Sequence, residues 1–258
     1  EALTTGSCNV ALGNGALKST TTSNNNTAVG TLAMGANTTG TENTAIGFKA
    51  LCDNTTASCN TAVGDSALTA NTTGCMNVAV GTQAMVKTTT GKENTAVGKL
   101  SMACNTTGSY NASFGTNTMQ RNTEGEENTA FGMQAMNQNT TGDNNTAVGA
   151  NALGDNTTAS GNTAIGKLAM KTNTTGATNT AVGLCALNAN TTASNNVAVG
   201  RGALIANTTG ADNTSVGKNS MLANTIGCRN VAVGSEAMDS NTEGNCNTAV
   251  GRKALVIN

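Results

Sequence analysis

The chain has 258 residues, a formal net charge of −1 and a hydrophobic fraction of 37%. It contains no Pro, Trp or His, one Tyr and three Phe, so it lacks the aromatic bulk that fills the core of an ordinary globular domain of this length. The charged residues are scattered singly and no apolar run reaches membrane-spanning length, which argues against a nucleic-acid partner and against membrane insertion.

A seventeen-residue repeat runs through the chain. Glycine recurs at this interval from Gly13 to Gly251, and the unit is N-T-A-V-G-x-x-A-L-x-x-N-T-T-G-x-x when it is numbered from its leading Asn. Position 1 is Asn and position 5 is Gly in all fifteen units. The first unit begins midway and the last stops at position 12 with Asn258. We therefore expect residues 1–258 to be a single uninterrupted repeat array and a segment of a longer fibre.

Each unit predicts two short strands and two turns. The first strand is T-A-V at positions 2 to 4, as at residues 27–29, and the second is x-A-L around positions 7 to 10, as at residues 32–35. Asn at position 1 and Gly at position 5 accept turn conformations, so they mark corners. The predicted fold is all-β, a parallel β-solenoid (β-roll) of about fifteen 17-residue coils.

Alternation along the first strand assigns its two faces. Position 4 is always large and apolar, and position 9 is always Leu or Met, so these two positions are the expected core. Position 3 then points away from the core, yet it is Ala in all units except two, which have Ser113 and Ser215. Either a narrow coil leaves room only for a methyl group, or this stripe packs against the same stripe of another chain in a lateral homo-oligomer.

The repeat resembles those of bacteriophage and large-virus tail fibres and is similar to the shorter head repeats of trimeric autotransporter adhesins. The resemblance covers the whole chain and depends on the A-V/I-G step, as in Thr27-Ala28-Val29-Gly30, and on the Ala-Leu that follows. It implies parallel β-rolls with three chains side by side, acting as rigid extracellular spacers or adhesive heads. The unit here is longer than that of the adhesins, and the chain contains no coiled-coil stalk, membrane-anchor barrel or terminal chaperone domain.

Nine units carry an Asn-Thr-Thr sequence at position 12, which is an acceptor motif for N-glycosylation in a secreted eukaryotic protein. Alternatively, the turn itself requires Asn-Thr, because Asn122, Asn224 and Asn241 keep this pair without the complete motif. The two interpretations remain open. The candidate acceptors are Asn37, Asn54, Asn71, Asn105, Asn139, Asn156, Asn173, Asn190 and Asn207.

Position 13 is Thr in every unit, from Thr4 to Thr242. Regular Thr arrays on flat solenoids resemble ice-binding faces, so an ice-binding β-solenoid is the alternative function. Such faces need two outward files on a flat strand, whereas Thr38 and Thr39 are adjacent and point in opposite directions. A hydrogen-bonded Thr ladder at a turn is the interpretation that we favour.

Two pairs among the eight cysteines fit neighbouring coils. Cys59 with Cys75 and Cys228 with Cys246 are each offset by one coil and one residue, which brings the Cα atoms within disulfide range. We expect both pairs to be bridged in an oxidising environment. The remaining four cysteines have no evident partner within the chain.

No residue pattern indicates catalysis. The chain has no His, no recurrent carboxylate pair, no C-x-x-C metal motif and no phosphate-binding loop, so we predict no enzyme activity, no cofactor and no metal site. The expected function is a structural or adhesive fibre segment that is extracellular or lies on a virion or cell surface. Its expected partners are copies of itself, in a lateral oligomer such as a trimer or in an end-to-end filament, and a cell-surface receptor or glycan.

Overall fold

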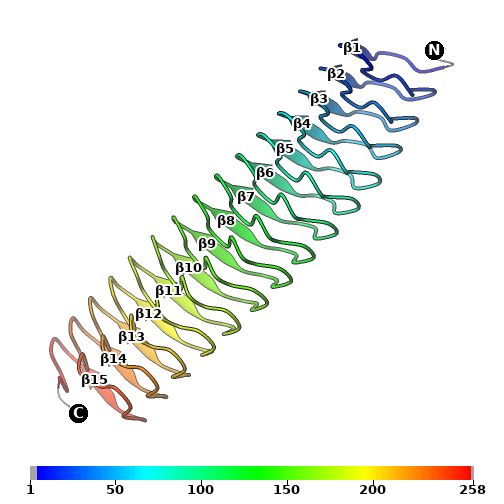
Figure 1. Ribbon diagram of the computed structural model, residues 1–258. Helices are drawn as coiled ribbons and strands as arrows, with labels where there is room; N and C mark the ends of the chain where they lie inside the picture. Colours follow the sequence, from blue (N-terminus) through cyan, green and yellow to red (C-terminus); the bar gives the residue numbers. More distant parts are fainter. Residues whose placement is uncertain (1–4, 257–258) are drawn as a thin grey trace. The chain divides into compact units, whose positions relative to one another are not determined.

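The computed structural model describes residues 5–256. Thr4 and Asn258, which belong to the repeat pattern of the sequence, lie outside the described residues. The chain divides into two compact units at Glu127 and Asn128. Both units are parallel β-solenoids in which each seventeen-residue coil contributes one strand of three residues (Figure 1). The predicted fold class is therefore confirmed.

In the first unit, consecutive strands pair in parallel with an offset of one repeat, so that Thr27 lies opposite Thr44 and Ala28 opposite Ala45. The strands of this unit are β1 (Val10–Leu12), β2 (Thr27–Val29), β3 (Thr44–Ile46), β4 (Thr61–Val63), β5 (Val78–Val80), β6 (Thr95–Val97) and β7 (Ala112–Phe114). Because equivalent residues stack on one another, each repeat position forms a file along the unit.

The second unit repeats this arrangement, with Thr163 opposite Thr180 and Ala164 opposite Ala181. Its strands are β8 (Thr129–Phe131), β9 (Thr146–Val148), β10 (Thr163–Ile165), β11 (Thr180–Val182), β12 (Val197–Val199), β13 (Thr214–Val216), β14 (Val231–Val233) and β15 (Thr248–Val250). Among residues 5–256 there is no helix that is long and apolar enough to cross a membrane.

The core consists of files of small side chains around one file of large ones. The Ala residues at positions 3 and 8, such as Ala28 and Ala33, are fully buried, and so is the Leu or Met at position 9, such as Met34. The prediction for position 9 is confirmed. The prediction for position 4 is wrong, because Val29 is half-buried and Ile46 is 41% exposed.

Coil width explains this inversion. The coil encloses two methyl groups, one long side chain and the Asn side chains of positions 1 and 12 per turn, and a β-branched side chain at position 3 would overfill that space. The narrow-coil interpretation of the position 3 stripe is therefore confirmed. The alternative hypothesis, that this stripe packs against the same stripe of another chain, is wrong because its side chains lie inside the coil. Where Ser replaces Ala, the buried hydroxyl finds a partner: Ser113 Oγ lies 2.8 Å from Ser101 Oγ, and Ser215 Oγ donates to the Ser220 carbonyl at 2.8 Å.

The predicted second strand is also wrong, because positions 6 to 11 form turns. The residues at positions 7 and 9 have a left-handed backbone conformation, with φ of 59° at Leu32 and 48° at Met34. Left-handed backbone at bulky residues is costly, and hydrogen bonds to neighbouring coils offset that cost. The Met34 N–H donates to the Ala50 carbonyl at 3.0 Å and the Leu32 N–H to the Asn14 carbonyl at 2.9 Å.

Glycine at position 5 is required at the corner that follows each strand. Its φ lies near 130°, as at Gly81, and its Cα faces the backbone of the next coil so closely that no Cβ would fit. The prediction that this glycine marks a corner is confirmed.

Candidate functional site

Two buried asparagine files run along the coils. At position 1, the Asn94 Nδ2 group donates to Asn77 Oδ1 at 3.2 Å and to the Gly108 carbonyl at 2.9 Å. The Oδ1 atom of Asn94 in turn accepts from the N–H of Asn111 at 3.0 Å and from its Nδ2 at 3.1 Å. Each amide thus joins three coils, which explains why position 1 is always Asn.

The nine asparagines of the Asn-Thr-Thr motifs form the second buried file, at position 12. The Asn54 Nδ2 group donates to Asn37 Oδ1 at 2.9 Å and to the Ala57 carbonyl at 3.0 Å, so both of its protons are used within the solenoid. A glycan on this nitrogen would have to replace those bonds inside the coil. The buried position supports the structural interpretation of the Asn-Thr turn and argues against glycosylation of the folded chain.

We therefore expect the folded protein, secreted from a eukaryotic host, to carry no N-linked glycan at these nine positions. Its intact mass should be unchanged by an N-glycosidase. A folded, soluble fraction with a glycan on Asn54 or an equivalent residue would contradict this assignment.

One break in the position 12 file offers a test of its energetics. Thr88 replaces Asn there, and the buried Asn71 Oδ1 atom on the preceding coil accepts no hydrogen bond. A Thr88→Asn variant would supply the missing Nδ2 donor, so we expect the free energy of unfolding to rise by about 1–2 kcal/mol. Denaturant titration measures this change, and Thr88→Val, which adds no donor, is the control. Equal stability of the Asn and Val variants would show that the file contributes little.

The threonines at position 13 form a hydrogen-bonded ladder at the turn, as favoured from the sequence. Thr38 Oγ1 donates to the Thr55 carbonyl at 3.0 Å, and Thr106 Oγ1 donates to the Thr123 carbonyl at 2.9 Å. These hydroxyls are used by the fold, so this file is not a free hydroxyl array for ice.

All eight cysteines are free thiols in the structure. The Cys246 N–H donates to the Cys228 carbonyl at 3.1 Å, which places this predicted pair on adjacent coils, although Cys228 Sγ contacts Asn245 Oδ1 at 3.0 Å. Desolvation, with a hydrogen bond to Glu42, raises the pKa of the Cys59 thiol; the nearby Cys75 adds to this. A higher pKa leaves less thiolate for disulfide exchange near neutral pH. Both disulfides stay predictions.

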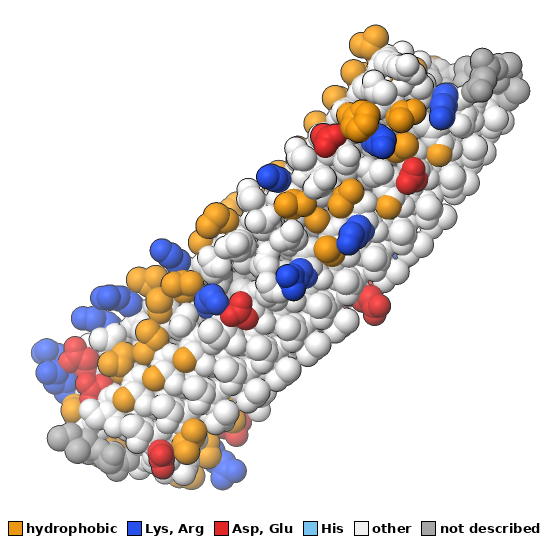
Figure 2. Space-filling model, viewed as in Figure 1, with side chains coloured by type: hydrophobic (Ala, Val, Ile, Leu, Met, Phe, Trp, Pro, Cys, Tyr) orange, Lys and Arg blue, Asp and Glu red, His pale blue; other side chains and the backbone are white. Residues whose placement is uncertain are grey.

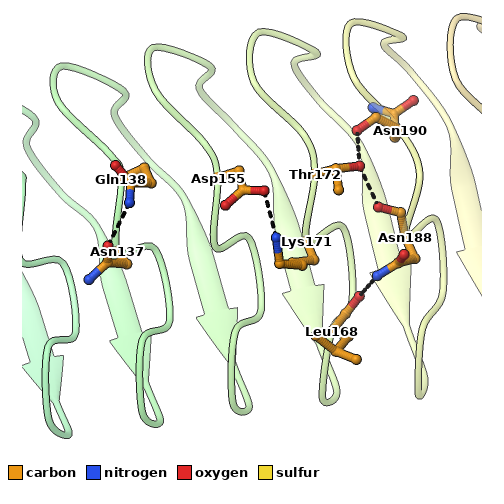
Figure 3. Close-up of polar contacts among 8 residues, drawn as sticks. All are labelled: Asn137, Gln138, Asp155, Leu168, Lys171, Thr172, Asn188 and Asn190. Carbon is orange, nitrogen blue, oxygen red and sulfur yellow. Dashed lines mark hydrogen bonds and ion pairs between the residues drawn. The ribbon is translucent and has the colours of Figure 1, made fainter.

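A few polar contacts join neighbouring coils at positions 10 and 11 of the second unit (Figure 3). Lys171 Nζ pairs with Asp155 Oδ2 at 2.7 Å, and Thr172 Oγ1 donates to the carbonyl of Asn188 at 2.7 Å. These side chains satisfy one another and stabilise the stack. Among residues 5–256, no three His, Cys, Asp or Glu side chains form a group that could hold a metal ion.

The surface that the sequence analysis missed is the outward side of the strands, which we call the outer sheet face. It consists of the side chains at positions 2 and 4, such as Thr27 and Val29, because position 3 points inward. In the first unit it comprises Val10, Thr27, Thr44, Thr61, Val78, Thr95 and Ala112 in one file and Leu12, Val29, Ile46, Val63, Val80, Val97 and Phe114 in the other. The T-x-V pattern of positions 2 to 4 would have predicted this face if the Ala at position 3 had been assigned to the core.

The second unit has an equivalent outer sheet face. Its files are Thr129, Thr146, Thr163, Thr180, Val197, Thr214, Val231 and Thr248, beside Phe131, Val148, Ile165, Val182, Val199, Val216, Val233 and Val250. Phe131 is 57% exposed and Ile165 is 40% exposed. Neither unit places a charged residue on this face, although charged side chains are scattered over other parts of the surface (Figure 2).

Comparison of the chain with models of protein families, with curated proteins and with solved structures finds no match. The chemistry of the outer sheet face is therefore the basis for inferring a function. That face has no nucleophile, acid or base beyond hydroxyl groups, and what it can do chemically is to bury apolar area and align hydroxyls.

Proposed function

We propose that the protein is a structural segment of an extracellular or virion-surface fibre, whose solenoids associate laterally with copies of the same chain through the outer sheet face. The observation that carries the proposal is the continuous uncharged face of β-branched and aromatic side chains along each unit. Apolar side chains gathered on one face are typical of an interaction site, and this face exposes Ile46 in the first unit and Phe131 and Ile165 in the second. Stiffness comes from the ladder of bonds between coils, which is the property that a spacer in a fibre requires.

Charge on this face tests the proposal. Replacing both Val63 and Val80 by Lys would put two unpaired cations into the contact, so we expect the wild type to sediment as an oligomer or filament and the variant as a monomer. The matched control places the same two lysines at the exposed Thr56 and Thr73, outside the face, and should assemble as the wild type does. A monomeric wild type at high micromolar concentration would reject the proposal.

Ice binding is a second candidate for the same face. Positions 2 and 4 provide the two outward files on a flat strand that positions 13 and 14 do not. However, Phe114 in the first unit and Phe131 in the second interrupt the regular array, and Val or Ala replaces several of the threonines. A lateral protein contact accommodates such variation more readily than a crystal lattice does. Thermal hysteresis activity of the monomeric wild type would favour ice binding over assembly.

A further inference from the structure

The outer sheet face is flanked by two exposed files. We call position 17, two residues before each strand, the leading rim, and position 6, two residues after each strand, the trailing rim. Glu93 lies on the leading rim and Lys218 on the trailing rim, and both side chains are exposed. Any molecule seated on the outer sheet face lies beside both rims, so their charges bear on which partner fits and in what orientation.

The leading rim of the first unit and the trailing rim of the second unit carry opposite charges. The charged residues of the leading rim in the first unit are all acidic: Glu42, Glu93 and Glu127. The charged residues of the trailing rim in the second unit are all basic: Lys167, Arg201, Lys218 and Arg252. All seven side chains are exposed. Each rim lies within one unit, so its spacing is fixed by the stacking of that unit alone.

The spacing of the acids matches that of three of the cations. Glu42 and Glu93 lie two residues before β3 and β6, three coils apart, and Glu127 lies two coils further along the same rim. Lys167, Lys218 and Arg252 lie on the coils that carry β10, β13 and β15, again at intervals of three and two. An offset of seven coils, from β3 to β10 and from β6 to β13, therefore aligns each acid of this leading rim with a cation of the trailing rim of the second unit.

Chain direction decides which rims meet. When two copies pack side by side in parallel, the leading rim of one copy lies against the trailing rim of its neighbour. When they pack antiparallel, each rim meets its own kind, so the acids of the leading rim cannot reach the cations of the trailing rim. Opposite charges across a contact favour association, so the rims favour the parallel arrangement.

The offset also gives more ion pairs than an in-register arrangement does. Without an offset, each leading-rim residue meets the trailing-rim residue beside the same strand, which gives two ion pairs, Glu93 with Lys99 at β6 and Asp212 with Lys218 at β13. With the offset of seven coils, the first unit brings no like charge against the second. Uncharged residues also meet, since Cys59 then faces Leu184 and Tyr110 faces Ser235.

We propose that copies of this chain pack in parallel with an offset of seven coils, about 34 Å at the usual strand spacing. This inference rests on the proposed lateral assembly through the outer sheet face. The intermolecular ion pairs are Glu42 with Lys167, Glu93 with Lys218, and Glu127 with Arg252. An interface between different parts of two identical chains does not close on itself when each copy is shifted along the axis, so the product is an extending filament.

Charge reversal tests the offset. Glu93→Lys and Lys218→Glu should each raise the concentration for half-maximal assembly by roughly tenfold, and the double variant should restore it to within about twofold of the wild type. Both residues are exposed, so circular dichroism should show an unchanged fold. The matched control is Asp65→Lys, on the trailing rim of the first unit, which faces no acid of a neighbour in this arrangement.

Carbodiimide cross-linking of a mixture of unlabelled and ¹⁵N-labelled protein gives a direct readout. The expected products are mixed-isotope peptides that join Glu93 to Lys218 and Glu42 to Lys167. Assembly that is unaffected by both single reversals and lacks these peptides would overturn the offset while leaving lateral assembly intact. A monomeric wild type would overturn both the offset and the lateral assembly. If the Val63 and Val80 lysine variant loses assembly but the charge reversals do not, only the proposed lateral assembly stands.

Discussion

Replacing Gly81 by alanine is expected to lower the free energy of unfolding by roughly 3–6 kcal/mol, since it combines backbone strain with a steric clash. Gly81 has φ of +130°, a conformation that residues with a Cβ rarely adopt. An added Cβ would lie 2.7 Å from both the carbonyl carbon and the oxygen of Gly98 on the next coil. Because those atoms are backbone, relief requires the two coils to move apart and weakens the adjacent ladder.

Hydrogen exchange measures this effect where it arises. Contacts in a solenoid reach only neighbouring coils. The protection of backbone amides from exchange should therefore decrease strongly in the coils of β5 and β6 and less in the coil of β2. Gly35→Ala is the matched control, because Gly35 has no positive φ and its added Cβ would meet nothing closer than 3.4 Å. Equal stability of the two variants would show that the corner tolerates a side chain.

The second large effect is expected from Asn94→Asp, which keeps the shape of the side chain but removes its donor. The new carboxylate would face Asn77 Oδ1 and the Gly108 carbonyl, both of which now accept from Asn94 Nδ2. A buried charge opposite two acceptors should cost about 3–5 kcal/mol at neutral pH.

The loss should shrink as the pH falls. Burial against acceptors raises the pKa of the introduced carboxyl in the folded state above its unfolded value, so the folded state binds the proton more readily. Stability is thus recovered below the folded pKa and lost as the pH rises through it. Urea titrations at several pH values measure this, with Asn25→Asp at an exposed position as the control. A pH-independent loss would mean that shape, not the donor, matters at position 94.

The sequence was sufficient to predict the repeat, the parallel stacking and the Gly corners, because Gly30 and its equivalents are the only residues that fit such a corner. The assignment of the two strand faces was wrong. Alternation along a strand allows either face to be the inner one, and the larger Val29 was assigned to the core although the coil has room only for Ala28. Residue size is a poor guide to burial in a coil this narrow.

The buried asparagines and the turn at positions 6 to 11 could not be predicted from residue preferences. Asn is usually exposed, and only stacking on identical neighbours satisfies Asn94 on both sides. Leu32 and Met34 have no intrinsic tendency to left-handed backbone, so nothing local indicated that positions 7 and 9 adopt it. The outer sheet face, and with it the candidate site, followed from these corrections.

The stacking of each residue on its equivalent seventeen positions away has a consequence for how such a gene can change. Duplication or deletion of seventeen codons, by slippage or unequal crossing-over, inserts or removes a coil whose new neighbours offer the same amide, carbonyl and methyl partners as the old ones. Length can therefore vary between descendants without redesign of any interior contact. The rim charges do not share this freedom, because each inserted coil shifts one set of charges relative to the other.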